Sequence, residues 1–339
     1  MSAAPKRPFD LMDFHSMPVR VAGEREARLA MADRMMNYCI RFLDDCIRAI
    51  LPHDLIVLGA PTGMGKTDMA LAIAMANAQR ERNVAYFALE AEPNELERRT
   101  KYAWLSREAF RLELFDRHKL NYTDWLLGRC DEMVGDLDQA ANQWMLSRLS
   151  GLRTFYRGQH FDAADLTRAI EAVHPHVELI VIDHLHYVDA EENQDEHRAL
   201  GDTTKAIRDV SLRVGKPILL VAHLRKRDPR LRALVPTLDD FHGSSNITKI
   251  ATQVITIERA ANIDAPKWWL SPTFMSVLKD RRAGTTGLVA LTFFDRRTRT
   301  YDDEYALGRL VKGGTQWEQI KPGDQPLWAT GHRQQELAL

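Results

Sequence analysis

The sequence has few cysteines and no long apolar run. Three cysteines occur among 339 residues, and none is spaced like the ligands of a metal site. Scattered cysteines in odd number are typical of reduced thiols in the cytosol. The N-terminus shows no signal-peptide pattern, and no apolar run is long enough to span a membrane. These absences favour a cytoplasmic protein with no membrane partner.

The chain also lacks an excess of charge of either sign. Its net charge is −1, with 45% hydrophobic and 27% charged residues. This composition supports a sizeable buried core. Because the molecule is not a polycation, any contact with nucleic acid must come from a local basic surface.

The composition divides the chain into three segments. Residues 1–41 begin with a proline-containing arm, followed by a helix expected over residues 24–37. Residues 42–311 alternate short apolar runs with longer helical patterns and are expected to form one domain. From residue 312 glycine and proline are frequent, which predicts a loosely ordered tail over residues 312–339.

The central segment predicts an α/β fold. The expected strands are Leu55–Leu58, Val84–Leu89, Leu179–Ile182, Pro217–Ala222, Val254–Ile257, Met275–Leu278 and Leu288–Leu291. Residues 66–79, 94–175 and 195–214 are expected to be mostly helical. Continuous apolar strands separated by helices indicate a mostly parallel sheet covered on both faces.

A glycine-rich loop follows the first expected strand. It consists of Ala60, Pro61, Thr62, Gly63, Met64, Gly65, Lys66 and Thr67. Glycines let successive backbone N–H groups point at phosphate oxygens beside a helix N-terminus. We therefore expect Lys66 to reach the β- and γ-phosphates of ATP, and Thr67 to ligate Mg²⁺.

Three polar residues stand where other strands end, which is the edge at which parallel sheets bind ligands. They are Glu90, Asp183 and His223. Asp183 is the candidate for positioning Mg²⁺ together with Thr67. Glu90 is a candidate base for the attacking water, although on spacing alone Glu92 is an equal rival and a solvated acidic loop is the alternative.

Five motifs in order make the sequence resemble the RecA-like motor domain of DnaB-type ring helicases. They occupy residues 60–67, 87–90, 181–186, 221–226 continuing to 238–247, and 278–287. The resemblance covers residues 43–301 and is strongest to the branch of phage primase-helicases and the mitochondrial helicase Twinkle. It implies a RecA-like P-loop NTPase core that hydrolyses ATP as a homo-oligomeric ring, with a hexamer expected, and moves on single-stranded DNA during replication.

The resemblance also implies roles for individual residues. It favours Glu90 as the catalytic glutamate and places His223 at a phosphate-sensing position. Lys279 and Arg281 match a pair that reaches into the neighbouring subunit's site, where the arginine neutralises charge on the γ-phosphate. Without the resemblance these two residues are an ordinary basic turn.

Other implied roles concern the base and the adjoining subunit. Arg259 and Phe294 match positions that sandwich the nucleotide base, although Phe294 is equally suited to the core. The helix expected over residues 24–37 resembles linker helices that dock on an adjacent subunit, and a dangling arm is the alternative. Other replication proteins are expected as partners, and a phage or plasmid as the source.

Two loops are candidates for contact with DNA, because the family directs them into the central channel. The first carries a basic cluster made of Arg225, Lys226, Arg227, Arg230 and Arg232. The second is small and polar and consists of His242, Gly243, Ser244, Ser245 and Asn246, with Lys249 close behind. Such groups contact phosphates without reading sequence. A solvated basic loop is the alternative for the first.

Some positions depart from the family pattern. His242 stands where the family has a basic residue, and an expected aspartate is replaced within residues 250–253. These departures leave open a second hypothesis, a RecA-fold ATPase that remodels a protein partner or acts in recombination or defence without unwinding. None of the remaining histidines has the spacing of a zinc site.

Overall fold

The structure is a computed structural model that describes residues 17–114, 120–158, 160–189, 196–225, 233–241 and 244–330. It separates into a unit ending at Met35 and a unit that begins at Met36, earlier than the domain boundary expected at residue 42. The first unit contains helix α1 (Met17–Asp33). This helix begins before the expected range of 24–37 and ends within it. Its early start is possible because Pro18 is tolerated in a first helical turn.

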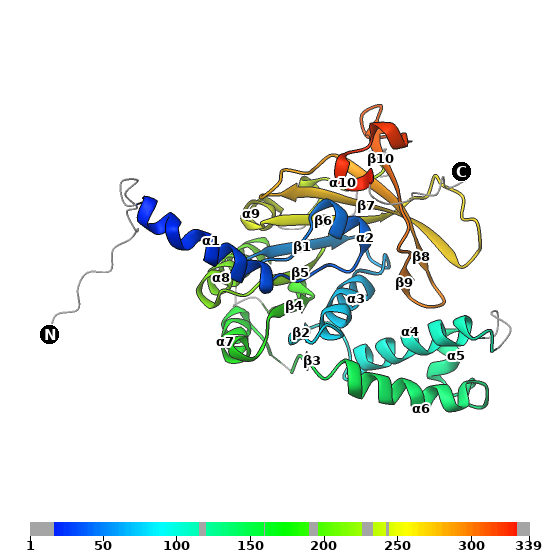
Figure 1. The fold of residues 1–339 in the computed structure, drawn as a ribbon. Helices are drawn as coiled ribbons and strands as arrows, with labels where there is room; N and C mark the ends of the chain where they lie inside the picture. The colour runs from blue at the N-terminus through cyan, green and yellow to red at the C-terminus, as the bar shows by residue number, and fades with distance from the viewer. Residues whose placement is uncertain are drawn as a thin grey trace. The chain divides into compact units, whose positions relative to one another are not determined.

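The described residues of the second unit form an 11-stranded sheet (Figure 1). Its parallel part runs in the order β6-β1-β5-β4-β2-β3, and antiparallel strands β7, β8, β10 and β11 extend it beyond β6, with β9 beside β8. The parallel strands are β1 (Leu55–Ala60), β2 (Val84–Ala88), β3 (Leu152–Tyr156), β4 (Leu179–Asp183), β5 (Ile218–His223) and β6 (Gln253–Arg259). The others are β7 (Leu270–Asp280), β8 (Leu288–Asp295), β9 (Thr300–Tyr301), β10 (Ala306–Val311) and β11 (Gln316–Gln319). The predicted α/β class is confirmed.

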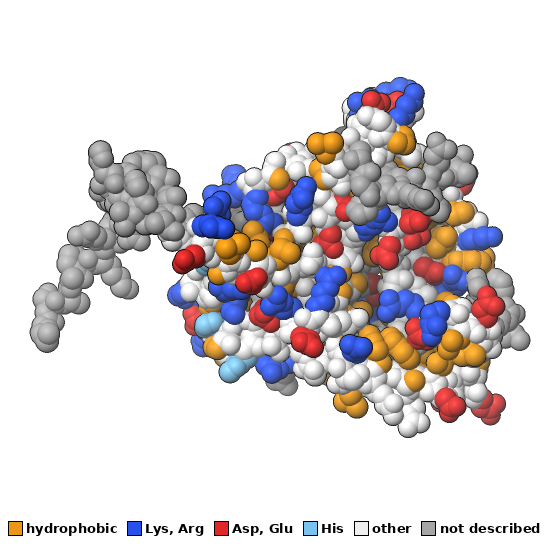
Figure 2. All heavy atoms as spheres, viewed as in Figure 1, with side chains coloured by type: hydrophobic (Ala, Val, Ile, Leu, Met, Phe, Trp, Pro, Cys, Tyr) orange, Lys and Arg blue, Asp and Glu red, His pale blue; other side chains and the backbone are white. Residues whose placement is uncertain are grey.

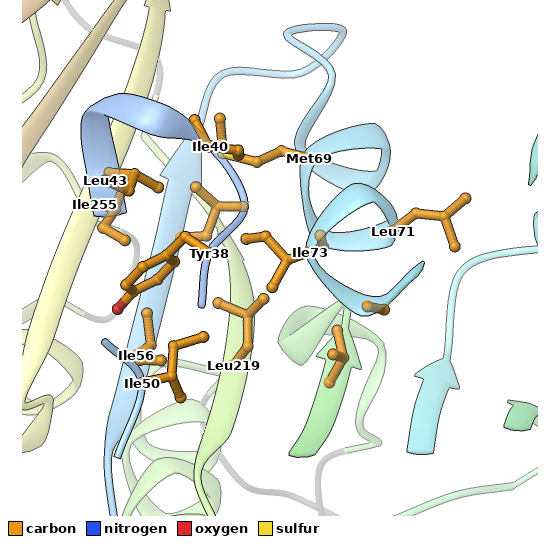
Figure 3. Close-up of a cluster of buried hydrophobic side chains, with 14 of the residues drawn as sticks. Tyr38, Ile40, Leu43, Ile50, Ile56, Met69, Leu71, Ile73, Leu219 and Ile255 are labelled. Carbon is orange, nitrogen blue, oxygen red and sulfur yellow. The ribbon is translucent and has the colours of Figure 1, made fainter. Parts of the chain in front are cut away.

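Helices cover both faces of the parallel strands. Along β1, Ile56 and Leu58 pack with α2 (Arg41–Cys46) and α3 (Lys66–Ala78), and Figure 3 shows this cluster. The alternate residues, Leu55 and Val57, pack with α7 (Ala163–Val173), α8 (Glu196–Val214) and α9 (Ser244–Ile250). Successive side chains of a strand point to opposite faces, so a strand buried on both sides is apolar throughout.

An insertion of helices lies between β2 and β3. It contains α4 (Glu95–Arg111), α5 (Tyr122–Leu126) and α6 (Asp131–Arg148), which share a core of their own. The expectation of mostly helical structure over residues 94–175 is therefore wrong at β3. This strand forms the edge of the sheet, where Phe155 stacks on Phe87 at 5.0 Å. All five of its side chains are at least partly exposed, so no continuous apolar run marks it.

The expected loose tail also contains a strand. Gly313 and Gly314, with φ of 67° and 87°, form the turn that joins β10 to β11, so these glycines mark a hairpin. Trp317 of β11 is buried, and its Nε1 donates to the carbonyl oxygen of Val289 at 3.1 Å. A short helix, α10 (Leu327–Thr330), follows, and residues 331–339 lie outside the described residues.

The visible surface carries both signs of charge. Figure 2 shows lysine and arginine side chains interspersed with aspartate and glutamate, as the net charge of −1 leads one to expect. Among the described residues, no helix is both apolar and long enough to cross a bilayer.

Candidate nucleotide site

The glycine-rich loop joins the carboxyl end of β1 to the first turn of α3. Gly63 and Gly65 adopt left-handed conformations with φ of 80° and 78°, which bring the loop back over the helix terminus. Lys66 is the first residue of α3, and its Nζ donates to the carbonyl oxygens of Ala60 at 3.0 Å and Pro61 at 3.2 Å. The ammonium group is thus held under the loop, where phosphates of a bound nucleotide lie in such sites.

Lys66 is buried, and its burial changes its charge behaviour. Desolvation lowers the pKa of Lys66 to about 8, although the negative charges of Asp183 and Glu90 oppose the effect. Its Nζ lies 3.4 Å from Nδ1 of His223 at the end of β5. A polyanion entering the loop would stabilise the charged form of this lysine.

Asp183 occupies the carboxyl end of β4 and is almost wholly buried. Tyr86 donates its hydroxyl to Oδ2 of Asp183 at 2.8 Å. Burial raises the pKa of Asp183 to about 6, against hydrogen bonds from Tyr86 and Thr67 that lower it. Oδ1 of Asp183 accepts no hydrogen bond among the residues that the structure describes. A buried carboxylate oxygen with spare acceptor capacity beside the Thr67 hydroxyl fits the oxygen ligands that Mg²⁺ prefers.

Glu90 stands beyond the end of β2 with its side chain 45% exposed. Tyr187 donates its hydroxyl to Oε1 of Glu90 at 3.3 Å, and Nε2 of His184 lies 3.4 Å from Oε2. His184 is buried and stacks on His223 with ring centroids 4.0 Å apart. Burial, followed by His223 and Lys66, lowers the pKa of His184 to about 2, so its ring stays neutral.

His223 was expected at this edge of the sheet, whereas His184 was not. Ligand atoms of Glu90, His184 and His223 lie within 4.8 Å of one another, a set that could hold a metal ion by donor type. Spacing along the sequence could not reveal this set of three ligands, because they come from the ends of three different strands, β2, β4 and β5. The structure thus unites Lys66, Thr67, Glu90, Asp183 and His223 at one edge, as the strand ends predicted.

A pocket of about 650 Å³ continues from the glycine loop past Glu90. It is also lined by Phe294, whose ring lies close to Gly65, and by Arg99, Arg296 and Arg299, three arginines that the sequence analysis missed. Arg299 is fixed by a two-pronged contact with Asp68 at 3.0 and 2.9 Å. Arg259, expected to face Phe294 across a base, is exposed at the end of β6 and is not among the lining residues.

Lys279 and Arg281 lie at the opposite edge of the sheet. Asp280 ends β7 opposite Gln253, which begins β6, so the turn after β7 is level with the start of β1. The six residues of β1 span about 20 Å, which keeps the exposed Arg281 well away from the glycine loop of its own chain. Lys279 donates from Nζ to the carbonyl oxygens of Thr248 at 2.7 Å and Lys249 at 2.9 Å, at the carboxyl end of α9.

The two loops expected to meet DNA start side by side. Leu224 bridges to Phe241, and the N–H of the exposed Arg225 donates to the carbonyl oxygen of Asp240 at 2.7 Å. Lys249 is exposed near the end of α9. The remaining candidates, Lys226, Arg227, Arg230, Arg232, His242 and Gly243, lie outside the described residues. Ser244, Ser245 and Asn246 form the first turn of α9, and the structure describes only their backbone.

Comparison with known proteins gives one family. A family model described as the DnaB-like helicase C terminal domain matches residues 36–302. No curated protein sequence matches this chain. Many solved structures share its fold, and three of them illustrate it. One of them, described as an ATPase domain, is 16% identical with a TM-score of 0.67, and the match covers 86% of this chain and 99% of that one.

Of the other two structures, one is a longer chain and the other has a lower TM-score. A DnaB-like replicative helicase, described with its interactions with primase, is 15% identical with a TM-score of 0.66, and the match covers 86% of this chain and 67% of that one. A KaiC-like protein, PH0186 from Pyrococcus horikoshii OT3, is 14% identical with a TM-score of 0.51, covering 78% and 96%. These likenesses confirm the RecA-like fold.

Proposed function

Because the chain belongs to the DnaB-like helicase C-terminal domain family, and is therefore an ATP-hydrolysing enzyme of the helicase type, we propose that it moves along single-stranded DNA as a ring. The observation that carries this proposal is the placement of Lys66 and Arg281 at opposite edges of one sheet. A chain that holds its phosphate loop at one edge and its candidate finger at the other needs a second copy to complete a site.

Within one chain the carboxyl edge would bind the nucleotide. Lys66 would hold the β- and γ-phosphates, and Thr67 and Asp183 would hold Mg²⁺, which would neutralise phosphate charge. Glu90, oriented by Tyr187, takes the proton of the attacking water. Phe294, whose ring lies close to Gly65 of the glycine loop, provides an aromatic face for the base.

The neighbouring copy would supply the missing cation. Arg281 enters the adjacent site and stabilises charge that develops on the γ-phosphate, with Lys279 beside it. Contacts of this head-to-tail kind close into a ring when the rotation between copies permits it. A hexamer is the size that the family leads us to expect.

Hydrolysis would be coupled to DNA through β5. His223, which lies 3.4 Å from the Lys66 ammonium, is two residues from Arg225 at the start of the first basic loop. A displacement of His223 by the γ-phosphate is therefore passed directly to that loop, and through the Leu224–Phe241 bridge to the second loop. Both loops would grip the phosphates of a single strand.

The setting that fits this activity is DNA replication at the nucleoid, in the cytoplasm. The replicated DNA would be that of a cell, a phage or a plasmid. A related DnaB-like helicase is described with its interactions with primase. We propose a primase as the first replication partner to test. A copurification of the two full chains with ATP present would check this.

ATP hydrolysis measured with and without single-stranded DNA tests the central proposal. We expect stimulation that weakens as salt rises, and displacement of one strand from a forked duplex. The Lys66→Ala variant should do neither and serves as the control. Hydrolysis that is indifferent to DNA at every salt concentration would refute the translocase. ATP-dependent capture of a protein partner with no unwinding at any fork would support the remodelling alternative.

A further inference from the structure

A buried hydrogen-bond network lies beneath the turn that carries Arg281. Its centre is Asp54, which directly precedes β1 and is only 5% exposed. Asp54 accepts hydrogen bonds from the Leu51 backbone N–H at 2.8 Å and from the Thr252 hydroxyl at 3.0 Å. The Arg282 guanidinium pairs with Asp54 through Nη1 at 3.1 Å. One carboxylate therefore gathers the start of β1, the start of β6 and the turn after β7.

The turn itself is held by further contacts from the same groups. The backbone N–H of Arg281 donates to the carbonyl oxygen of Thr252 at 2.9 Å. Arg282 donates from Nη2 to the carbonyl oxygen of Ala49 at 2.5 Å, and its backbone N–H donates to Asp280 Oδ1 at 3.1 Å. Thr252 thus holds Asp54 with its hydroxyl and Arg281 with its carbonyl. The backbone of Arg281 is fixed while its side chain stays exposed.

Burying a carboxylate is unfavourable unless charge and hydrogen bonds compensate it. Burial raises the pKa of Asp54. The Leu51 N–H, the Arg282 guanidinium and the Thr252 hydroxyl oppose this rise, because each favours the ionised carboxylate. Thr252 lies in the stretch where the sequence lacks an expected aspartate, and a second carboxylate there would repel Asp54. Because Asp54 is buried, breaking its pair with the partly exposed Arg282 would leave the carboxylate less well compensated.

Two contacts hold this turn against β6 and β1, because the Arg281 N–H donates to the Thr252 carbonyl oxygen and the Arg282 guanidinium pairs with Asp54. A change at Asp54 would therefore shift the backbone from which the Arg281 side chain projects. We propose that Asp54, acting through Arg282 and Thr252, is a positioning residue that aims Arg281 into the nucleotide site of the neighbouring subunit. The inference rests on the proposed function, in which Arg281 acts in trans. On this proposal β1 serves two nucleotide sites. Its carboxyl end leads into the glycine-rich loop of its own site, and Asp54 before its first residue positions Arg281 for the neighbouring subunit's site.

Substitution of Asp54 by Asn tests the assignment. The variant keeps its own phosphate loop, so ATP affinity should stay within about twofold of wild type, whereas misplacing a catalytic group by about 1 Å should lower kcat by roughly 10- to 100-fold. Asp45→Asn is the matched control, because Asp45 also pairs with an arginine, Arg41, and accepts from a hydroxyl, that of Tyr305 at 2.8 Å. It should leave kcat unchanged.

Subunit mixing separates positioning from general damage. A Lys66→Ala subunit cannot bind phosphate but keeps an intact finger, so mixing it with Asp54→Asn subunits should raise hydrolysis above the sum of the two pure proteins. Arg281→Ala subunits mixed with Lys66→Ala subunits are the reference. If this mixture hydrolyses ATP no faster than the two pure proteins together, Arg281 does not act on the neighbouring subunit's site, and the proposed function is refuted. If mixing restores hydrolysis to Arg281→Ala but not to Asp54→Asn, only the positioning role of Asp54 is refuted.

A second variant guards against misfolding. Arg282→Gln breaks the same ion pair from its partly exposed partner, whose side chain is 31% exposed, and should be rescued by mixing as Asp54→Asn is. Binding of a fluorescent ATP analogue reports whether each variant keeps a folded nucleotide site. Variants that bind the analogue like wild type, yet show undiminished kcat in pure form, would overturn the assignment.

Discussion

Replacing Asp183 by Asn should make the nucleotide-free protein more stable while abolishing hydrolysis. The native pKa of this carboxyl is about 6, above its ordinary value of 3.8, because it is buried at the end of β4. The native state therefore binds this proton more tightly than the unfolded chain does. Each tenfold difference in proton affinity is worth about 1.4 kcal/mol, so ionised Asp183 costs about 3 kcal/mol near neutral pH.

The sign of the effect fixes its pH dependence. Below pH 3.8 both states of the wild type hold the proton, and the variant has no advantage from this source. Between pH 3.8 and about 6 the unfolded carboxyl ionises while the native one keeps its proton, so the advantage of Asp183→Asn should grow over this range and level off above about pH 6. For a chain of this length about 3 kcal/mol corresponds to roughly 5 °C in the melting temperature.

Thermal unfolding of both proteins between acid and neutral pH measures this directly. A saturating Mg²⁺–nucleotide complex should stabilise the wild type by about 3 kcal/mol or more and remove the variant's lead. Asp138→Asn is the control, since that 39% exposed carboxylate pairs with Lys101 at the surface and should change stability by less than about 1 kcal/mol. A variant less stable than wild type at neutral pH without nucleotide would refute the reasoning.

Three other predictions concern catalysis, binding and the sheet edge. Glu90→Gln should lower turnover by roughly 10²- to 10⁴-fold while ATP stays bound, whereas Glu92→Gln should keep turnover, as a phosphate-release assay would show. ATP affinity should fall as pH rises above about 8, because the pKa of Lys66 is about 8 and only the ammonium form attracts phosphate, and titrating a fluorescent nucleotide analogue would measure this. Trp317→Ala should cost about 3–5 kcal/mol in urea unfolding, because a buried ring and its hydrogen bond to Val289 are lost.

Each of these has an outcome that contradicts it. Undiminished turnover by Glu90→Gln would move the base to another residue, with Glu92 the first to examine. An ATP affinity that is flat between neutral and alkaline pH would mean that burial does not control the charge of Lys66. An unfolding free energy unchanged by Trp317→Ala would mean that β11 contributes nothing to the sheet.

The parallel core was predictable because it is buried on both faces. Such strands are largely apolar, so β1, β4 and β5 stand out in the sequence, and the polar residues that end β4 and β5 mark the binding edge. Asp183 and His223 were found in this way. The strands at the margins were missed, because β3 is half exposed and β11 lies among glycines that also suit a loose tail.

The rest of the site depends on contacts between residues far apart in sequence. Arg299 reaches the pocket only because the β8–β9 hairpin folds over Asp68, and Tyr86 meets Asp183 only because β2 pairs with β4. No local pattern records either contact. The position of Arg281 likewise follows from the antiparallel register of β7 on β6, which the sequence does not specify.

Because β1 separates Lys66 from Arg281 of the same chain, the number of complete catalytic centres in the proposed assembly depends on whether the ring is closed. A lone chain completes no catalytic centre, and an open row of chains completes one fewer centre than it has members, since the terminal arginine at one end faces solvent. Closure adds the last centre. Turnover per chain should therefore rise with protein concentration even when ATP is saturating, and an open row would tolerate Arg281→Ala at one end but not at the other.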